Sequence, residues 1–238
     1  MKLIQGIEAV DLAIYVKNTL IIADIHIGIE EAMNRQGVFV PRFQFSDILN
    51  RMKGILDALK GRKIERIVIN GDLKHEFGTI SDQEWRHTLK FIDFLGAHCG
   101  EILLVKGNHD TILGPIANKR KLKIVENVEL GDILICHGDK VLEDIGKYNT
   151  IIIGHEHPAI SLREGSRVET YKCYLVGKYK GKRLIVQPSF NLVMEGTDVL
   201  KERLLSPFLR GIDDFNICAV EDRIYELGKV KSLRLGQP

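Results

Sequence analysis

Polar residues suited to metal binding and acid–base chemistry recur directly after short apolar runs in this sequence. The clearest case is EILLVKGNHD, Glu101 to Asp110, where four apolar residues lead through a glycine into Asn, His and Asp. The same arrangement occurs in TLIIADIH before Gly28, RIVINGD ending at Asp72, DILICHGD ending at Asp139 and TIIIGHEH ending at His157. Imidazole and carboxylate groups together suit manganese, iron, zinc or cobalt, whereas calcium and magnesium prefer oxygen ligands. The residue types therefore indicate a site for divalent transition metals.

The candidate residues include six of the eight histidines of the chain. The complete set is Asp24, His26, Asp72, His75, Asn108, His109, Asp110, His137, His155 and His157. Any single motif can be explained as an ordinary turn or a buried structural histidine, but this explanation accounts poorly for five such motifs in succession. A tetrahedral zinc site uses about four side chains, and at least seven are on offer here. Two metal ions that share a carboxylate account for the set better than one.

Each apolar run is typical of a buried strand, and the glycine near its end marks a turn. In α/β sheets, ligands bind beyond the carboxyl ends of the strands, so we expect the five ends to converge on one site. Between the runs, helical spacing predicts helices from Ser46 to Lys60 and from Ser81 to Leu95. Ser46 or Asp47 is the predicted cap of the first of them. This alternation of helix and strand predicts an α/β fold.

Four further segments carry local signals. Hairpins are predicted to turn at Lys17–Asn18 and at Lys180–Gly181. A short helix is expected near Val141 to Lys147. The segment GVFVPRFQF, broken by Pro41, is either a loop that lines the site or a surface connection.

Length and composition limit the class of protein. A chain of 238 residues can bury a substantial core, and its formal net charge of +2 gives no strong global field for nucleic acid or anionic membranes. The four cysteines are scattered without a CxxC pair, which argues against a disulfide framework or a thiolate zinc site. The N-terminus is a poor signal peptide, and no apolar run approaches membrane-spanning length. We therefore expect a cytoplasmic protein with no membrane segment.

The motifs resemble the five signature blocks of the calcineurin-like metallophosphoesterase superfamily. The matching residues are Asp24-x-His26, Gly71-Asp72, Gly107-Asn108-His109-Asp110, His137-Gly138 and Gly154-His155-x-His157. The blocks span residues 24–157. We expect one domain over residues 1–238, in which residues 158–238 form C-terminal strands and a tail and no separate capping domain follows.

Two motifs narrow the resemblance. GDLKH, with His75 three residues after Asp72, is similar to the SbcD-type repair nucleases. ADIHIGIEEAM followed by GVFVP resembles the SbcD-related archaeal phosphoesterases and the bacterial DNA-ligase-associated phosphoesterases. The resemblance implies a four-layer α/β/β/α sandwich with two mixed sheets.

The resemblance also implies a ligand set for two divalent metal ions. In it, Asp24, His26 and His157 hold the first ion, Asn108, His137 and His155 hold the second, and Asp72 bridges both. Manganese is the favoured metal, with iron, zinc, nickel and cobalt as alternatives. His109 is implied to face the substrate phosphate.

Charge and proton chemistry then suggest a mechanism. Two dications outweigh the two aspartates and a bridging hydroxide, so the site stays cationic and attracts phosphate, and the hydroxide attacks phosphorus in line with the leaving oxygen. We expect His109 to protonate the leaving alkoxide or to bind its developing charge. His75 is the candidate to orient His109. Asp110 competes for that role, although it could instead cap the next helix.

The predicted function is hydrolysis of phosphodiester bonds in nucleotides or nucleic-acid ends. A small-molecule phosphomonoesterase and a non-catalytic interaction scaffold are the alternatives. The expected partner is a phosphoester substrate, extending to a nucleotide or single-stranded nucleic acid, and DNA-repair proteins are candidate partners; the oligomeric state is open. Basic clusters at Lys119 to Lys123 and around Tyr179 (Lys178, Lys180, Lys182 and Arg183) could grip a nucleic-acid backbone or be solvated surface lysines.

Overall fold

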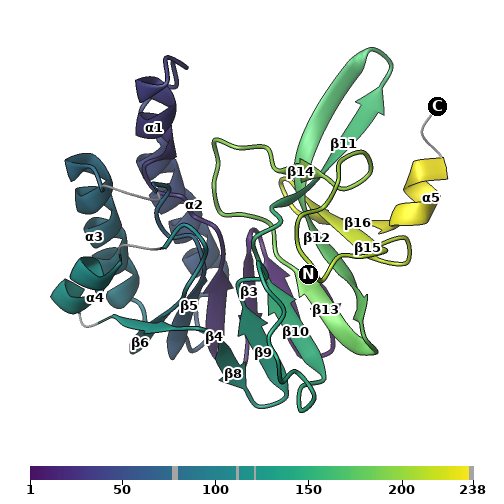
Figure 1. Cartoon of the computed structure of the whole chain (residues 1–238), viewed down its shortest axis with the longest axis horizontal. Helices are drawn as coiled ribbons and strands as arrows, with labels where there is room; N and C mark the ends of the chain where they lie inside the picture. Colours follow the sequence, from purple (N-terminus) through teal and green to yellow (C-terminus); the bar gives the residue numbers. More distant parts are fainter. Residues whose placement is uncertain (77–79, 111–112, 121, 236–238) are drawn as a thin grey trace.

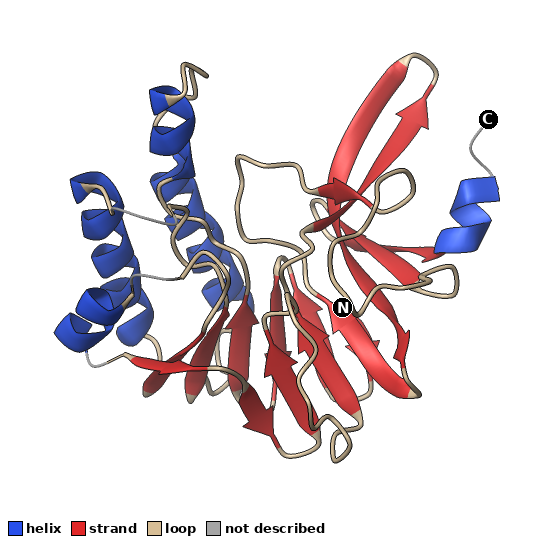
Figure 2. Cartoon of the chain, viewed as in Figure 1, coloured by secondary structure: helices blue, strands red, loops and turns tan. Residues whose placement is uncertain are grey.

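Two mixed β-sheets pack against each other in the computed structural model, which describes residues 1–76, 80–110, 113–120 and 122–235 (Figures 1 and 2). The first sheet runs in chain order as β1 (Lys2–Ile4), β2 (Ile7–Val10), β3 (Ala13–Val16), β4 (Thr19–Ile22), β5 (Arg66–Asn70), β6 (Glu101–Val105) and β7 (Lys123–Val125). Strands β1 to β4 pair antiparallel, and β4 to β7 pair parallel. The predicted turn at Lys17–Asn18 joins β3 to β4.

The second sheet has the order β14-β11-β12-β13-β10-β9-β8, with β15 paired to β12 and β16 to β15. Its strands are β8 (Val128–Leu130), β9 (Ile133–Cys136), β10 (Thr150–Ile153), β11 (Pro158–Glu164), β12 (Arg167–Tyr179), β13 (Lys182–Val186), β14 (Thr197–Asp198), β15 (Asn216–Val220) and β16 (Ile224–Lys229). Strands β9, β10 and β13 are parallel. The β12–β13 hairpin turns at Lys180–Gly181, as predicted.

Strand alternation divides the apolar residues between two cores. Successive side chains of a strand point to opposite faces of its sheet. Ile152 and Ile185 therefore join the core between the sheets, whereas their neighbours Ile151 and Leu184 join a second core on the outer face of the second sheet. Every residue of β4 is buried, because this strand is covered on both faces. Buried strands of this kind explain the continuous apolar runs in the sequence.

Helices cover the outer face of the first sheet (Figure 2). They are α2 (Gln44–Ala58), α3 (Asp82–Gly96) and α4 (Gly114–Arg120), while α1 (Ile29–Arg35) stands beyond the strand ends. Helix α2 buries Ile48, Met52 and Ile55 along one stripe. Helix α3 begins where the helix from Ser81 was predicted: Ser81 is its N-cap, and Ser81 Oγ accepts the Glu84 backbone N–H at 3.1 Å.

Two local predictions were wrong. Helix α2 begins before the predicted caps Ser46 and Asp47: its N-cap is Phe43, and Ser46 Oγ instead donates to the Phe43 carbonyl at 2.7 Å. The segment 141–147 forms turns instead of a helix. Within it, the Gly146 N–H donates to Asp144 Oδ1 at 3.1 Å, which closes a local turn that competes with helix formation.

The outer face of the second sheet is covered mainly by irregular chain. Ile145, Tyr148, Phe208 and Leu209 are buried there, and the short helix α5 (Val230–Leu235) follows β16. The predicted α/β/β/α architecture with two mixed sheets is thus confirmed, with one outer layer largely non-helical. None of the helices in the described part of the chain is long and apolar enough to cross a membrane.

Candidate metal centre

All seven predicted metal ligands follow the carboxyl ends of parallel strands. Asp24 and His26 follow β4, Asp72 follows β5, Asn108 follows β6, His137 follows β9, and His155 and His157 follow β10. The ends of the two sheets meet directly, because the backbone N–H of His155 donates to Asp24 Oδ2 at 2.9 Å. Side chains far apart in the sequence therefore share one space.

Five of these residues have a left-handed backbone. Asp24, His26, Asp72, His155 and His157 have φ values between 44° and 66°. This region is unfavourable for residues with a Cβ atom and is concentrated at functional sites when it occurs. Backbone hydrogen bonds between the loops hold it in place: the N–H of Asp24 donates to the Gly71 carbonyl at 3.2 Å, and that of His26 to the Asp72 carbonyl at 2.9 Å.

The motif glycines allow the loops to approach closely. A Cβ atom on Gly107 would lie 2.1 Å from Asp72 Oδ1, and one on Gly71 would lie 2.0 Å from His137 Nδ1. A Cβ on Gly154 would lie 2.6 Å from Asp24 Oδ2. Any larger residue at these positions would displace a candidate ligand.

The polar atoms form two overlapping groups around Asp72. In the first, His26 Nε2 lies 3.3 Å from His157 Nε2 and 3.7 Å from Asp72 Oδ2. In the second, His137 Nε2 lies 2.9 Å from Asn108 Oδ1, 3.2 Å from His155 Nδ1 and 3.5 Å from Asp72 Oδ2. Two ligands bound at about 2.1 Å to one ion stand roughly 3 Å apart or slightly more. The spacing therefore fits one ion in each group.

Unpartnered buried atoms provide a separate test of whether the residues fit a metal. Asp24 is fully buried, and its Oδ1 has no hydrogen-bond partner within the described chain. A buried carboxylate oxygen without a partner is costly. A bound cation would remove this cost, and the mixture of imidazole, carboxylate and amide ligands is one that divalent transition metals accept.

The pKa values indicate the same need for positive charge. Burial raises the pKa of Asp24, but the facing His157 and His137 outweigh it and lower the value to about 2. Burial and the charges of Asp24 and Asp110 raise the pKa of Asp72 to about 9. Both carboxylates cannot ionise cheaply together unless a cation lies between them.

The histidines are held in the form that binds metals. Burial lowers the pKa of His155 to about 4, with His137 adding to the effect. Burial and His157 lower the pKa of His26 well below its usual value. Both imidazoles are therefore neutral at pH 7 and can offer a lone pair without first losing a proton.

His109 and His75 face the same space as His26. The three imidazoles form a third group whose nitrogens lie within 4.8 Å of one another. The backbone N–H of His109 donates to Asp72 Oδ1 at 2.9 Å, and its Nδ1 lies 2.7 Å from the His75 carbonyl oxygen. The contact that orients His109 therefore comes from the backbone of His75, while the two rings stack at 5.6 Å between centroids.

Asp110 has a different position from the one expected of an orienter. It is buried, and its two oxygens accept the backbone N–H groups of Leu73 at 3.2 Å and Gly107 at 3.0 Å. These bonds tie the loop that carries Asp72 to the loop that carries Asn108. Asp110 thus acts on the two loops and not on the His109 ring in these contacts.

Sequence reasoning missed four buried polar residues that brace the centre. Lys74 is fully buried and donates to the carbonyls of Glu76 and, at 2.8 Å, His109. Glu84 accepts the His75 N–H at 2.9 Å, Gln44 donates to the His26 carbonyl at 3.1 Å, and Glu156 accepts the N–H groups of Leu205 and Ser206 at 2.8 Å. Only Glu156 carried a signal in the sequence, because it stands between two candidate ligands.

A two-sheet α/β fold with a buried histidine–aspartate cluster at its strand ends is the architecture of a metallophosphoesterase. Residues 17–193 match the family of calcineurin-like phosphoesterases, and the chain belongs to that family. No protein with a curated description matches the sequence.

A solved structure shares the fold. The nuclease MPE of Pseudomonas putida is 19% identical, with a TM-score of 0.65 over 92% of each chain. The zinc complex of Vps29 from Entamoeba histolytica is 19% identical, with a TM-score of 0.33 over 87% of this chain and 90% of that one. At this identity the likeness to the nuclease shows the fold alone.

Proposed function

We propose that this protein is a phosphodiesterase that uses two divalent metal ions and acts on nucleotides or on the ends of nucleic acids. Membership of the calcineurin-like phosphoesterase family supports metal-dependent phosphoester hydrolysis. The observation that carries the proposal is the overlap of two ligand groups at Asp72 Oδ2, which is 3.7 Å from His26 Nε2 and 3.5 Å from His137 Nε2. One carboxylate within reach of both groups is what a two-metal centre requires.

The proposed ligands divide between the sheets. Asp24, His26 and His157 would hold one ion, and Asn108, His137 and His155 the other, with Asp72 between them; manganese is the favoured metal. When bound, such a pair of dications activates a water molecule and neutralises the phosphoryl oxygens. The remaining chemistry falls to residues that are not ligands.

His109 is the proposed proton donor to the leaving group. Burial lowers its pKa, and a substrate phosphate at the centre would favour the protonated form of the ring. Its Nδ1 lies 2.7 Å from the His75 carbonyl oxygen. Nδ1 would carry a hydrogen in that contact, and Nε2 would then face the site and pass a proton to the leaving oxygen.

His75, three residues after Asp72, also supports the narrower likeness to SbcD-type nucleases.

The basic clusters found in the sequence are poor candidates for gripping a nucleic acid at this centre. Arg183 pairs with Thr150, the first residue of β10, whereas His155 follows the last residue, Ile153. The cluster around Tyr179 is therefore at the opposite end of the strands. In the other cluster, Arg120 is paired with Asp93 and Lys123 with Glu101. Lys119 Nζ lies 5.9 Å from the centroid of the Trp85 ring, and Lys121 lies outside the residues that the structure describes. Among the described residues, neither cluster therefore supplies a group of unpaired cations beside the site.

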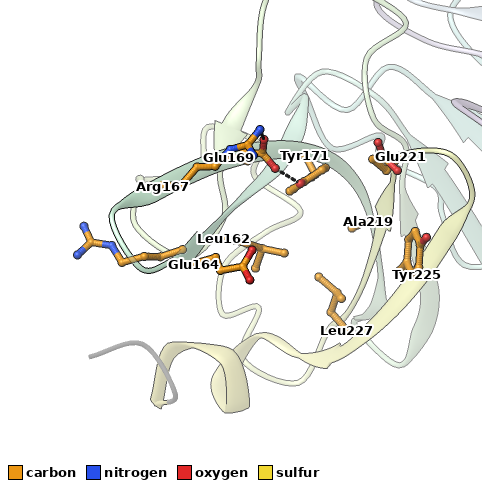
Figure 3. Close-up of a pocket in the computed structure, with 10 residues that line it drawn as sticks. Leu162, Glu164, Arg167, Glu169, Tyr171, Ala219, Glu221, Tyr225 and Leu227 are labelled. Carbon is orange, nitrogen blue, oxygen red and sulfur yellow. Dashed lines mark hydrogen bonds and ion pairs between the residues drawn. The ribbon is translucent and has the colours of Figure 1, made fainter.

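A cavity of about 550 Å³ between the β11–β12 hairpin and strands β15–β16 is equally unsuited to a phosphate backbone (Figure 3). Its lining residues are Leu162, Arg163, Glu164, Arg167, Glu169, Tyr171, Ala219, Glu221, Tyr225 and Leu227. Three carboxylates stand there against two guanidinium groups, and Arg167 is already paired with Glu169. None of these three regions therefore favours binding of a nucleic-acid substrate away from the centre.

A screen of metals against phosphoesters tests the proposal. The purified chain would be stripped of metal and reloaded with Mn²⁺, Ni²⁺, Co²⁺, Zn²⁺ or Mg²⁺. Each form would then be assayed on a phosphomonoester, a cyclic nucleotide, bis-p-nitrophenyl phosphate and a single-stranded oligonucleotide. We expect diester hydrolysis that is highest with Mn²⁺, and oligonucleotide cleavage that weakens as salt is raised. Turnover of monoesters alone would refute the substrate class, and bound metal without any turnover would indicate a scaffold.

A further inference from the structure

The segment from Gly37 to Phe43, between α1 and α2, presents aromatic side chains to solvent. Phe39 is 92% exposed, Phe43 66% and Val38 49%. A phenylalanine side chain is ordinarily buried because of its large apolar area, and neighbouring exposed apolar residues indicate a contact surface. The sequence left open whether this segment lines the site or merely connects two helices.

Side-chain hydrogen bonds hold the segment in a defined conformation. Asn34 Nδ2 donates to the Val40 carbonyl at 2.8 Å, and the Val40 N–H donates back to Asn34 Oδ1 at 3.3 Å. The Val38 N–H donates to the Met33 carbonyl at 3.0 Å. A segment fixed in this way loses little further entropy when it binds a ligand.

The same segment is attached to the metal centre. Gln44, the residue after Phe43, donates from its side chain to the carbonyl of the candidate ligand His26 at 3.1 Å. Its backbone N–H donates at 3.0 Å to buried Glu30, which lies in α1 just after that ligand. Figure 1 shows α1 standing beyond the carboxyl ends of β4 and β5, on the side where the ligands emerge. Phe43 is therefore next in sequence to a residue that contacts the backbone of a candidate ligand.

The charge in the segment is suited to a polyanion. Arg42 lies between Pro41 and Phe43, is exposed, and forms no close ion pair among the described residues, although its charge acts on Glu30. The other arginine nearby, Arg35 at the end of α1, is paired with Glu31. Alternating aromatic and cationic side chains are the arrangement that proteins use to bind single-stranded nucleic acids, with rings stacking on bases and the cation meeting phosphate.

We propose that Phe39, Arg42 and Phe43 form a base-stacking platform that holds single-stranded nucleic acid at the metal centre. This inference rests on the proposed function and names the substrate class of the same site. A second copy of the chain is a less suitable occupant, because a stable protein interface buries roughly 800 Å² on each partner. A seven-residue segment interrupted by an unpaired arginine offers much less apolar area than that.

Paired substrates separate base stacking from phosphate binding. The test compares kcat/KM for a short oligodeoxythymidylate with kcat/KM for an abasic oligomer of the same length. In the double variant Phe39→Ala/Phe43→Ala, the ratio of the two should fall by roughly tenfold or more. In Phe39→Leu/Phe43→Leu this ratio should fall as far, because leucine keeps the apolar area but cannot stack on a base. Leu235→Ala, which removes an 88%-exposed apolar residue on α5, is the matched control and should leave the ratio unchanged.

A leucine variant that retained the wild-type ratio would overturn the proposal, as would an alanine variant that did. Sedimentation velocity of the same proteins tests the competing occupant. If alanine, but not leucine, converted a dimer to a monomer while the substrate ratio stayed constant, the segment would be a self-association surface and the proposal would be wrong.

Fluorescence tests binding without catalysis. Trp85 is the single tryptophan of the chain, so Phe39→Trp in a Trp85→Phe background places one reporter in the segment. In EDTA, the oligodeoxythymidylate should quench this reporter several-fold more than the abasic oligomer does. Selective quenching by oligodeoxythymidylate in a protein that hydrolyses no phosphoester would refute the proposed function but support the base-stacking platform. Hydrolysis of bis-p-nitrophenyl phosphate without selective quenching would refute the platform and keep the function.

Discussion

Hairpin turns and metal-centre loops of this protein use the same unusual backbone conformation with opposite consequences. The non-glycine residues with positive φ fall into two groups: Asp11, Lys17, Asn18 and Lys180 lie in hairpin turns, and Asp24, His26, Asp72, His155 and His157 lie at the centre. In the turns, Lys17 and Lys180 are exposed, and Asp11 and Asn18 are half-buried. At the centre, Asp24, His26 and Asp72 are buried.

The difference lies in what maintains the conformation. A hairpin turn is imposed by the short ladder that it closes, as Val16 pairs with Thr19 across Lys17–Asn18. At the centre, each loop is held by another loop, as when the His109 N–H donates to Asp72 Oδ1. A change in a turn should therefore alter stability alone. A change at the centre should alter metal binding and catalysis as well.

The largest effect is expected from Asp72→Asn. Asp72 Oδ2 is the oxygen shared by both ligand groups, and an amide would remove its charge from between the two proposed ions. Turnover of bis-p-nitrophenyl phosphate should fall by about 10⁴ or more, because metal activation is worth several kcal/mol. Metal analysis after dialysis should show fewer than the wild-type number of ions, and EDTA should reduce the wild type to the level of the variant. Full metal occupancy in the variant would contradict the bridging role.

A comparable loss without loss of metal is expected from His109→Ala. His109 is assigned to no ion, and its imidazole is oriented by the His75 carbonyl oxygen at 2.7 Å. Removal of a proton donor should lower turnover by roughly 10² to 10⁴. The loss should be smallest for substrates whose leaving group needs no proton, such as p-nitrophenolate. Equal metal loss in this variant and in Asp72→Asn would show that His109 is a ligand instead.

A pair of glycines compares centre and turn directly. In Gly107→Ala the new Cβ would lie 2.1 Å from Asp72 Oδ1 and 2.4 Å from its backbone nitrogen, so the carboxylate must move. We expect turnover to fall by about 10², the cost typical of a displacement near 1 Å. In Gly181→Ala, at φ 81° in the β12–β13 turn, the Cβ would meet nothing within 4 Å. This variant should lose about 1 kcal/mol of stability and keep its turnover. A similar loss of turnover in both variants would remove the distinction.

Lys74→Met should have a smaller effect on turnover. It removes the buried ammonium group that donates to the His109 carbonyl at 2.8 Å, which should cost about 1–3 kcal/mol of unfolding free energy and roughly tenfold in kcat. Metal content should be unchanged, because the Lys74 ammonium donates to the carbonyls of Glu76 and His109, neither of which is a proposed ligand. Lys53→Met, at an exposed position on α2, is the matched control. Loss of stability with wild-type kcat would mean that Lys74 only supports the fold.

Lys74 also illustrates what the sequence could not reveal. The apolar runs predicted β5 at Arg66–Asn70 and β10 at Thr150–Ile153 because strands buried on both faces leave a continuous pattern. The candidate ligands could also be recognised from the sequence, because polar residues directly after a buried apolar run are poor choices for packing. A lysine in GDLKH, by contrast, reads as a solvated surface residue, and only its tertiary partners show that it is buried.

The division into two sheets was equally hidden in the local pattern. It came from the family resemblance, because β4 and β10 look alike in sequence although they belong to different sheets. The helix predicted at 141–147 does not form, because the apolar residues of this segment, including Ile145, pack in an irregular conformation against the outer face of the second sheet. A helix after Asp110 was anticipated only as one alternative for that residue, and the bounds of α4 were not predicted, since its seven residues contain both Gly114 and Pro115.

The smallest effect on turnover should come from removing a contact between the two sheets that involves no proposed metal ligand. Tyr174 of β12 is fully buried, and its hydroxyl lies 2.8 Å from the Asp11 carbonyl and 2.9 Å from that of Ala13, both in the first sheet. Tyr174→Phe should lower the free energy of unfolding by about 1–2 kcal/mol, measured by urea denaturation, and should keep its turnover as Gly181→Ala does.

The pH dependence of the difference in unfolding free energy between wild type and Tyr174→Phe tests whether the Tyr174 hydroxyl causes that difference. Burial raises the pKa of Tyr174 well above its usual value, so the folded state keeps its proton at a pH where the unfolded chain releases it. The stabilisation is complete below about pH 10, the pKa of an unfolded tyrosine, and is lost as the pH rises further. The stability gap between wild type and variant should therefore narrow above about pH 10 and stay constant between roughly pH 7 and 9. A gap independent of pH throughout would mean that the variant loses packing and not the neutral hydroxyl's bond between the sheets.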